Sequence, residues 1–255
     1  MGTYRISTLV GAVALAALTT ALPAAASTFN ISPIRAQLSS AHRTEVLTLM
    51  NAEDQPVVVQ IHVVAWSQKD GEEQLVDTRE ILATPPVLQI PAMGEQIVRV
   101  ALRRDADPAR ELTYRVIFDE VPQAAPANFT GLRVALRLSV PVFVTPAQSK
   151  LPSELAWEAH ALPDGRIEVA ATNHGSRHLQ VTDFNLDAKG AATSTKDTAG
   201  TLRGMTAKYV LPGSRMTWTL QATEHAAAPP NSATLVIHGH SDQGDFSADV
   251  AFNGR

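Results

Sequence analysis

The amino-acid sequence predicts an all-β protein built from two β-sandwich domains joined end to end. Strand-like segments with turn residues between them recur along the chain, about seven of them between residues 29 and 146. No segment has a convincing helical period in its apolar residues. A proline-rich stretch at residues 145–152 then predicts a linker, and shorter strand-like segments follow it.

Residues 1–26 are typical of a cleaved signal peptide. A short basic start ends at Arg5, an uncharged run extends from Leu9 to Ala26, and three small alanines close it. A membrane anchor is the alternative, but the run is interrupted and lacks a basic stop-transfer cluster. No later segment approaches the roughly 20 apolar residues that span a bilayer. We expect cleavage near Ala26 and a mature protein in the periplasm, with no membrane insertion.

The composition argues against disulfide bonds and against a nucleic-acid-binding protein. The chain contains no cysteine, so its fold has to rest on its apolar core without disulfides. The formal net charge is −4, and there is no basic tail or basic–aromatic interleaving. We therefore expect no nucleic-acid partner.

The first predicted domain holds strands that follow one another at short intervals. They are expected at residues 29–38 (interrupted by Pro33), 45–51, 57–66, 88–90, 96–102, 112–121 and 132–144. The run 57–66 is so rich in β-branched residues that we expect both of its faces to be covered. Residues 68–71, Gln-Lys-Asp-Gly, have the chemistry of a turn.

The most informative strand is the last one of this domain. Large aliphatic residues fill every even position from 132 to 140, and Arg, Ala or Ser fill the odd positions. This period of two predicts one apolar face and one basic, small-residue face. Pro141 indicates a sheet edge, because proline cannot donate a hydrogen bond to a neighbouring strand. An open apolar edge strand would be available to pair with another chain.

The second predicted domain has shorter strands and no recognisable motif. They are expected at residues 155–160, 166–172, 179–184, 217–222 and 233–238, with connections rich in Ser, Thr and Gly.

No catalytic motif is present, and we expect no enzyme activity and no cofactor. The sequence lacks a nucleophile elbow, a zinc-protease helix motif and a phosphate-binding glycine loop. His238 and His240 would share one face of a strand, but two histidines without a third ligand are typical of the surface rather than of a metal site. Asp119 and Glu120 would point to opposite faces of their strand and therefore cannot form an acid–base pair.

The chain resembles the periplasmic pilus and fimbrial assembly chaperones of the PapD/FimC type, and its style suggests their archaic subgroup. The resemblance rests on segments that occur in the family's order between residues 29 and 146. They are Ile34-Arg35-Ala36, Trp66, Ile81–Pro86, Gly94 with Ile97-Val98-Arg99, Tyr114 with Glu120-Val121-Pro122, and Val142–Pro146. The resemblance implies two immunoglobulin-like β-sandwich domains, at residues 27–146 and 147–255.

The resemblance also implies the function. Such chaperones insert a strand of their own into pilus subunits that lack one, and deliver the subunits to an outer-membrane usher. The implied donor residues here are Leu132, Val134, Leu136, Leu138 and Val140. The alternation alone leaves open that these residues pack the chain's own core instead.

The family clamps the terminal carboxylate of the subunit with two basic residues. One of them matches Arg35, whose guanidinium suits carboxylate capture. The other is a lysine, and Pro141 stands at its position, so Arg137 or Arg115 would have to replace it. A second departure is Thr145, where an arginine would bridge to Glu111. We therefore expect Glu111 to lack this partner, and the interdomain angle to be set in another way or to be looser.

Two further interpretations remain open. The chain could be a secreted structural or adhesive β-sandwich protein of a pilus, although the residues after Ser27 make a poor N-terminal donor segment. The exposed apolar row also predicts self-association of the chaperone through the same strand.

Overall fold

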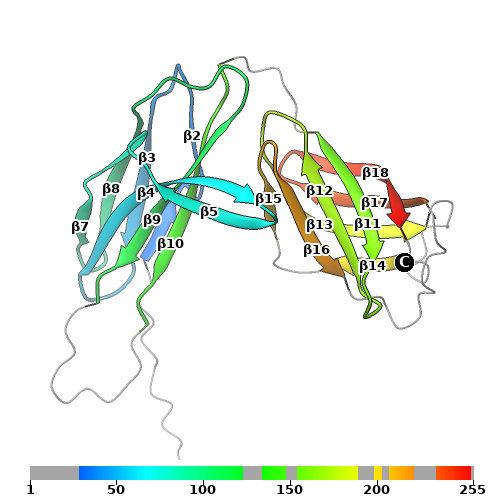
Figure 1. Ribbon diagram of the computed structural model, residues 1–255. Helices are drawn as coiled ribbons and strands as arrows, with labels where there is room; N and C mark the ends of the chain where they lie inside the picture. The colour runs from blue at the N-terminus through cyan, green and yellow to red at the C-terminus, as the bar shows by residue number, and fades with distance from the viewer. Residues whose placement is uncertain are drawn as a thin grey trace, which may run out of the picture.

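The protein folds into two lobes made of β-strands (Figure 1). The computed structural model describes residues 29–122, 134–147, 154–188, 198–202, 207–220 and 234–253. Residues 29–144 form two sheets that pack on each other, and residues 155–253 form the third sheet. In these ranges there is no helix of the length and apolarity that crossing a membrane requires.

The first lobe is a sandwich of two sheets. The first sheet has the order β1-β3-β8-β6 and consists of β1 (Phe29–Ser32), β3 (Thr44–Asn51), β8 (Glu95–Leu102) and β6 (Ile81–Thr84). The second has the order β2-β10-β9-β4-β5, and β7 also pairs with β4. Its strands are β2 (Ala36–Leu38), β10 (Arg137–Val144), β9 (Leu112–Glu120), β4 (Val57–Lys69), β5 (Glu72–Asp77) and β7 (Val87–Ile90).

The second lobe is one sheet with the order β14-β13-β17-β18-β11-β12-β16, and β15 pairs with β13. Its strands are β11 (Leu155–Ala161), β12 (Ile167–Asn173), β13 (Leu179–Ala188), β14 (Thr198–Leu202), β15 (Lys208–Val210), β16 (Arg215–Leu220), β17 (Thr234–Ser241) and β18 (Gly244–Asn253).

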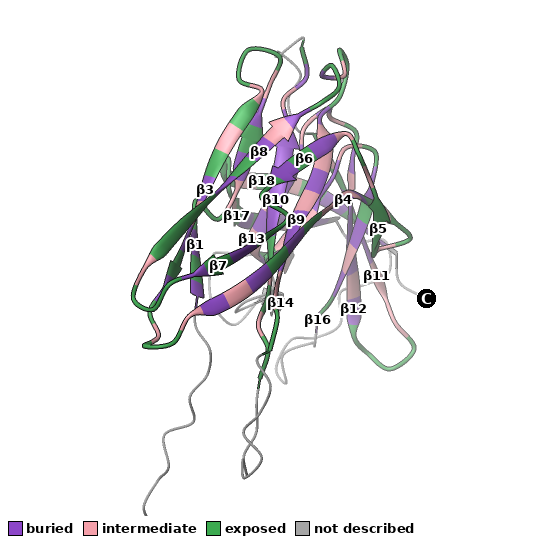
Figure 2. Cartoon of the chain, turned by 90° about the vertical axis from the view of Figure 1, so that its left-hand side faces the viewer, coloured by how far each residue is buried: buried purple, intermediate pink, exposed green. Residues whose placement is uncertain are grey.

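Alternating burial along the strands builds the cores (Figure 2). In β4, Val59 and Ile61 are buried while Gln60 and His62 are exposed. The prediction that both faces of this strand are covered is therefore wrong for its first half. The same prediction is correct near Trp66, which is 2% exposed, because the second lobe covers that end of the strand.

Three apolar clusters correspond to the two lobes and their junction. One lies between the two sheets of the first lobe, and a second lies inside the second lobe. The third consists of Trp66, Phe143 and Leu211, with Tyr209 packed against it. Because this cluster takes residues from both lobes, burial of aromatic area holds the lobes together.

Each lobe uses a buried asparagine in the same way. The Nδ2 of Asn51 donates to the carbonyls of Gln55 (2.7 Å) and Pro91 (3.0 Å). The Nδ2 of Asn173 donates to the carbonyls of Arg177 and Val210, both at 2.8 Å. Both side chains thus satisfy carbonyl groups of two loops at the end of a strand, which fixes those loops.

Most predicted strands are present, and those that were missed have identifiable reasons. The expected strand at 29–38 splits at Pro33 into β1 and β2, which join different sheets. β5 was not predicted, because all six of its residues are exposed and no alternation marks it. β6, β14, β15 and β18 were also missed. The predicted turn is confirmed at Asp70-Gly71, whose φ angles of 53° and 82° suit a tight hairpin.

Candidate functional site

β10 has an open edge along its first half. β9 pairs with the whole of β10, whereas β2 pairs only with residues Val142–Val144. Within the described ranges, no strand pairs with the other side of Arg137–Pro141. The predicted edge strand is therefore present at Pro141 and before it, but β2 covers the end of β10 beyond the proline.

The backbone groups at this edge point in a direction that can be deduced. The Glu120 N–H donates to the Leu136 carbonyl (2.9 Å), and the Thr145 N–H donates to the Leu38 carbonyl (2.8 Å). Because successive residues of a strand direct their backbone groups to opposite sides, Arg137 and Ser139 direct theirs away from β9. Pro141 faces the same way but has no N–H. The outward-facing backbone groups of Arg137 and Ser139 can therefore bind one more strand at this edge.

The predicted donor residues differ in burial. Val134 is 58% exposed, while Leu136 and Leu138 are half-buried and pack against the first core. Val140 is 4% exposed and belongs to that core. Leu132 lies outside the described residues. The regular strand begins at Arg137 rather than at residue 132, so the row passes from the chain's own core at one end to solvent at the other.

Arg115, one of the two expected substitutes for the missing lysine, is next to Pro141 in the sheet. It lies directly opposite Pro141 in the pairing of β9 with β10, so the two side chains share a face. That face is turned to the second lobe. The Arg115 guanidinium lies 3.8 Å from the centre of the Trp66 ring, donates to the Ser139 hydroxyl (3.2 Å) and pairs with Glu73 (2.6 Å).

Arg35 contacts the second lobe. Its Nη1 lies 2.6 Å from Oδ2 of Asp242, in the turn between β17 and β18. Arg35 and Arg115 both lie at the junction of the lobes. Arg115 lies over the Trp66 ring, whose centre is 5.4 Å from that of Tyr209. Arg35 pairs with Asp242, which also lies 3.4 Å from the imidazole of His178.

Arg137 lies at the other end of the strand. It forms an ion pair with Asp119, its partner in the pairing of β10 with β9, and its side chain is 72% exposed. Four residues separate it from Pro141, which corresponds to about 13 Å along a strand. The structure therefore brings Arg35 and Arg115 to the junction of the lobes and leaves Arg137 away from it.

Glu111 lacks an arginine partner at Thr145, as expected, but it is paired with a histidine that the sequence did not indicate. His178 of the second lobe places its Nδ1 2.5 Å from Oε2 of Glu111, and the His178 backbone N–H donates to the same oxygen (2.9 Å). Both side chains are almost fully buried, at 4% and 1% exposure. The imidazole stacks on Phe143 with ring centres 3.6 Å apart. An imidazole thus occupies the bridging role left open by Thr145.

The electrostatics of this junction favour a charged imidazole. Burial disfavours the charge, but hydrogen bonds to Asp242 and Glu111 outweigh it and raise the pKa of His178 above its ordinary value. Burial also acts against the Asp242 charge. Hydrogen bonds from His178, the Gln180 N–H and Arg35 outweigh it and lower the pKa of Asp242 to about 2.

The hairpin of β4 and β5 forms a second connection between the lobes (Figure 1). The Gln68 side chain donates to the Tyr209 carbonyl (2.8 Å) and accepts from the Leu211 N–H (2.9 Å). This pair of bonds resembles an added rung of a β-ladder and fixes the hairpin against the second lobe.

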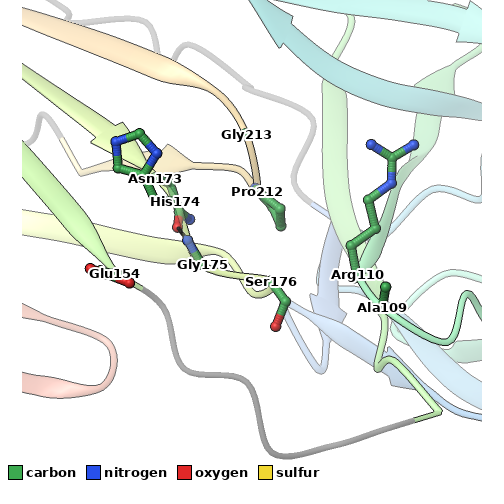
Figure 3. A pocket seen from close by; sticks show the side chains of 9 residues that line it. All are labelled: Ala109, Arg110, Glu154, Asn173, His174, Gly175, Ser176, Pro212 and Gly213. Carbon is green, nitrogen blue, oxygen red and sulfur yellow. Dashed lines mark hydrogen bonds between the residues drawn. The ribbon is translucent and has the colours of Figure 1, made fainter.

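A hollow of about 450 Å³ lies where loops of the two lobes meet (Figure 3). Ala109 and Arg110 border it from the first lobe, opposite Pro212 and Ser176 of the second. Most of its lining consists of exposed loop residues, unlike the apolar, enclosed sites that bind small molecules. We assign no ligand to it.

His238 and His240 are exposed on β17. His240 pairs with Asp183 at 2.7 Å, and the structure groups no three potential ligands of a metal ion in the described part of the chain.

Sequence reasoning missed His178, Asp242 and Glu73. His178 and Asp242 lie in turns of the second lobe, where no motif marks them, and Glu73 lies on the unpredicted β5. A charged residue that is buried against the opposite lobe leaves no periodic signal in the sequence.

The comparisons with known proteins agree with this geometry. Residues 28–150 match the family model of the pili and flagellar-assembly chaperones, PapD N-terminal domain. A search of curated proteins found no match.

Solved structures extend the likeness to both lobes. The chain is similar to one in the CsuC–CsuE chaperone–tip adhesion subunit pre-assembly complex from archaic Csu pili of Acinetobacter baumannii, with 21% identity, 89% of this chain and 99% of that chain covered, and a TM-score of 0.63. It is also similar to the E. coli chaperone DraB, with 17% identity, 88% of this chain and 97% of that chain covered, and a TM-score of 0.55. A third similar structure is the Salmonella enterica SafA pilin–SafB chaperone complex, with 17% identity, 87% of this chain and 96% of that chain covered, and a TM-score of 0.55. At these identities the likeness is one of fold.

Proposed function

We propose that this protein binds and stabilises pilus subunits by donating a strand to them, because residues 28–150 match the family model of the pili and flagellar-assembly chaperones, PapD N-terminal domain. The observation that carries the proposal is the open edge of β10 at Arg137–Pro141, continuous with the half-exposed apolar row that begins at Val134.

The burial gradient suggests which residues do the donating. Val134, Leu136 and Leu138 have apolar surface left to bury, whereas Val140 is already in the chain's own core. Completing the burial of one such aliphatic side chain is worth up to about 1.5–3 kcal/mol. A subunit with an open apolar groove would gain this energy together with the backbone hydrogen bonds of a new strand.

Arg115 and Arg35 are suited to hold the terminal carboxylate of the subunit. Both lie at the junction of the lobes, and Arg115 is at the position opposite Pro141. Arg137, the other substitute considered, lies about 13 Å further along the strand and would contact the body of the subunit instead.

The test is capture of a subunit from the same gene cluster, co-expressed in the periplasm. Val134→Asp should fold, because that side chain is 58% exposed, but should lose most of the soluble 1:1 complex. Val87→Asp is the matched control, since Val87 is 54% exposed on β7 and lies far along the chain from the donor row. The double variant Val134→Asp with Leu136→Asp should abolish capture. Equal capture by the Val134 and Val87 variants would refute the donor assignment, and a wild type that captures no subunit would refute the chaperone function.

Further parts of the proposal follow from the family. Pilus chaperones of this type act in the periplasm and are not known as enzymes; delivery to an outer-membrane usher and removal of residues 1–26 as a signal peptide are our proposals for this chain. The first 28 residues lie outside the described part of the structure. Self-association through the open edge also stays a prediction, and a monomer in size-exclusion chromatography at high concentration would contradict it.

A further inference from the structure

The two arginines at the junction of the lobes are already paired with carboxylates of the chain itself. Arg35 pairs with Asp242, and Arg115 pairs with Glu73. A carboxylate that enters from a partner must therefore compete with one of these two internal acids. The two pairs differ in how firmly the acid is held.

Asp242 is fixed from several directions. Its side chain is 10% exposed, its Oδ1 accepts from the Gln180 N–H (2.8 Å), and its Oδ2 lies near both Arg35 and the His178 Nε2 (3.4 Å). Displacing it would leave a buried imidazole without one of its acids, which is costly. Asp242 is thus part of the junction.

Glu73 is held loosely. Its side chain is 45% exposed, and it belongs to β5, all of whose residues are exposed and which pairs with β4 on one side. Its Oε1 lies 2.6 Å from Nη2 of Arg115, and this is the one ion pair the side chain makes within the described residues. Rotation into solvent would cost little beyond this contact.

Arg115 remains in place without Glu73. Its strand is flanked by β4 and β10, its guanidinium lies against the Trp66 ring, and Nη1 donates to Ser139. Its Nε is buried and has no acceptor in the described part of the chain. The side chain is 14% exposed, so the guanidinium has to keep an anionic partner when a ligand covers it.

From these contacts we infer that Glu73 is an internal competitor that occupies Arg115 in the free chaperone and leaves when the terminal carboxylate of a subunit binds there. The inference rests on the proposed function. Its consequence is that Glu73 keeps the charge of Arg115 paired while no subunit is bound. Its return to Arg115 also favours release of the subunit.

The experiment compares full-length mature chaperones loaded with the same co-purified subunit. Labelled chaperone in the complex is exchanged against an excess of unlabelled chaperone, and the half-time is measured. For Glu73→Gln we expect exchange slower by about two- to fivefold, because a partly exposed ion pair no longer competes. Glu72→Gln is the matched control, since Glu72 is exposed on the same strand but points to the opposite face.

Two further measurements tie the effect to the carboxylate at Arg115. The double variant Glu73→Gln with Arg115→Gln should exchange at the rate of Arg115→Gln alone. A subunit extended by four residues at its C-terminus, which moves the carboxylate by up to about 13 Å, should show no slowing with Glu73→Gln.

The outcomes separate the two claims. If wild type forms the complex but Glu73→Gln exchanges at the wild-type rate or faster, the competitor role is wrong while the chaperone function stands. Faster exchange would show that Glu73 positions Arg115 for binding. If wild type forms no complex, the proposed function fails, and this inference fails with it.

Discussion

Replacing His178 by phenylalanine should weaken the junction between the lobes. The phenyl ring can keep the stacking on Phe143 but removes both ring nitrogens. Glu111, whose side chain is 1% exposed, would then retain only the backbone N–H of residue 178. Removing one partner of a buried ion pair costs about 3–5 kcal/mol. The loss of stability cannot exceed the free energy needed to separate the lobes, because separation exposes Glu111 to water.

The effect of His178 on the free energy of unfolding should depend on pH. The pKa of His178 is raised in the folded protein, so folding favours the protonated form. Its contribution to stability is complete below the unfolded pKa of about 6.5 and is lost as the pH rises through the folded value. Asp242 has a pKa of about 2 when folded, so its contribution is lost as the pH falls from about 4 towards 2. The junction should be strongest between about pH 4 and 6.5.

The assay is urea denaturation of wild type and His178→Phe from pH 5 to 9, with solution X-ray scattering to detect separation of the lobes. The gap between the two free energies of unfolding should be largest near pH 6 and should shrink towards pH 9. Adding Glu111→Gln to the variant should recover part of the loss, because the buried carboxylate no longer lacks a counter-charge. A gap below about 0.5 kcal/mol at pH 6, with unchanged scattering, would refute the reasoning.

Three other substitutions test the packing by thermal denaturation. Asn173→Ala should cost about 2–4 kcal/mol, because it removes the amide donor from one buried and one part-buried carbonyl; a loss below about 0.5 kcal/mol would contradict this. Gly239→Ala should cost about 1–3 kcal/mol, since a Cβ would lie 2.4 Å from the Asp183 carbonyl oxygen, and an unchanged melting temperature would show that the strand can move aside. Gln68→Ala should cost about 1–2 kcal/mol through two lost bonds to the second lobe, whereas exposed Gln74→Ala should cost almost nothing; equal losses would disprove the role of Gln68.

The fold was predictable wherever burial follows a period of two. The strands around Val59 and Val98 carry that pattern, and they are present where they were expected. β5 was not predictable, because an exposed edge strand has no buried face to impose alternation. β10 was predicted too long at its start, since alternation does not tell where a neighbouring strand stops pairing.

The candidate site was predictable in part. The edge character of the strand follows from Pro141, and Arg35 and Arg115 were named from the family pattern together with the departure at residue 141. The partner of Glu111 was not predicted. Its partner is 67 residues away, in a turn of the other lobe, and nothing local to either residue signals the contact.

By itself, the sequence determined that this chain is all-β, that its core needs no disulfide, and that one apolar strand ends at a proline. These properties are local, because side-chain period and proline chemistry act on neighbouring residues. The tertiary structure alone decided which charges meet. Arg35 and Asp242 are 207 residues apart, and their pairing depends on how two lobes dock. Coulomb energy depends on distance in space and on burial, and the order of residues specifies neither until the chain has folded.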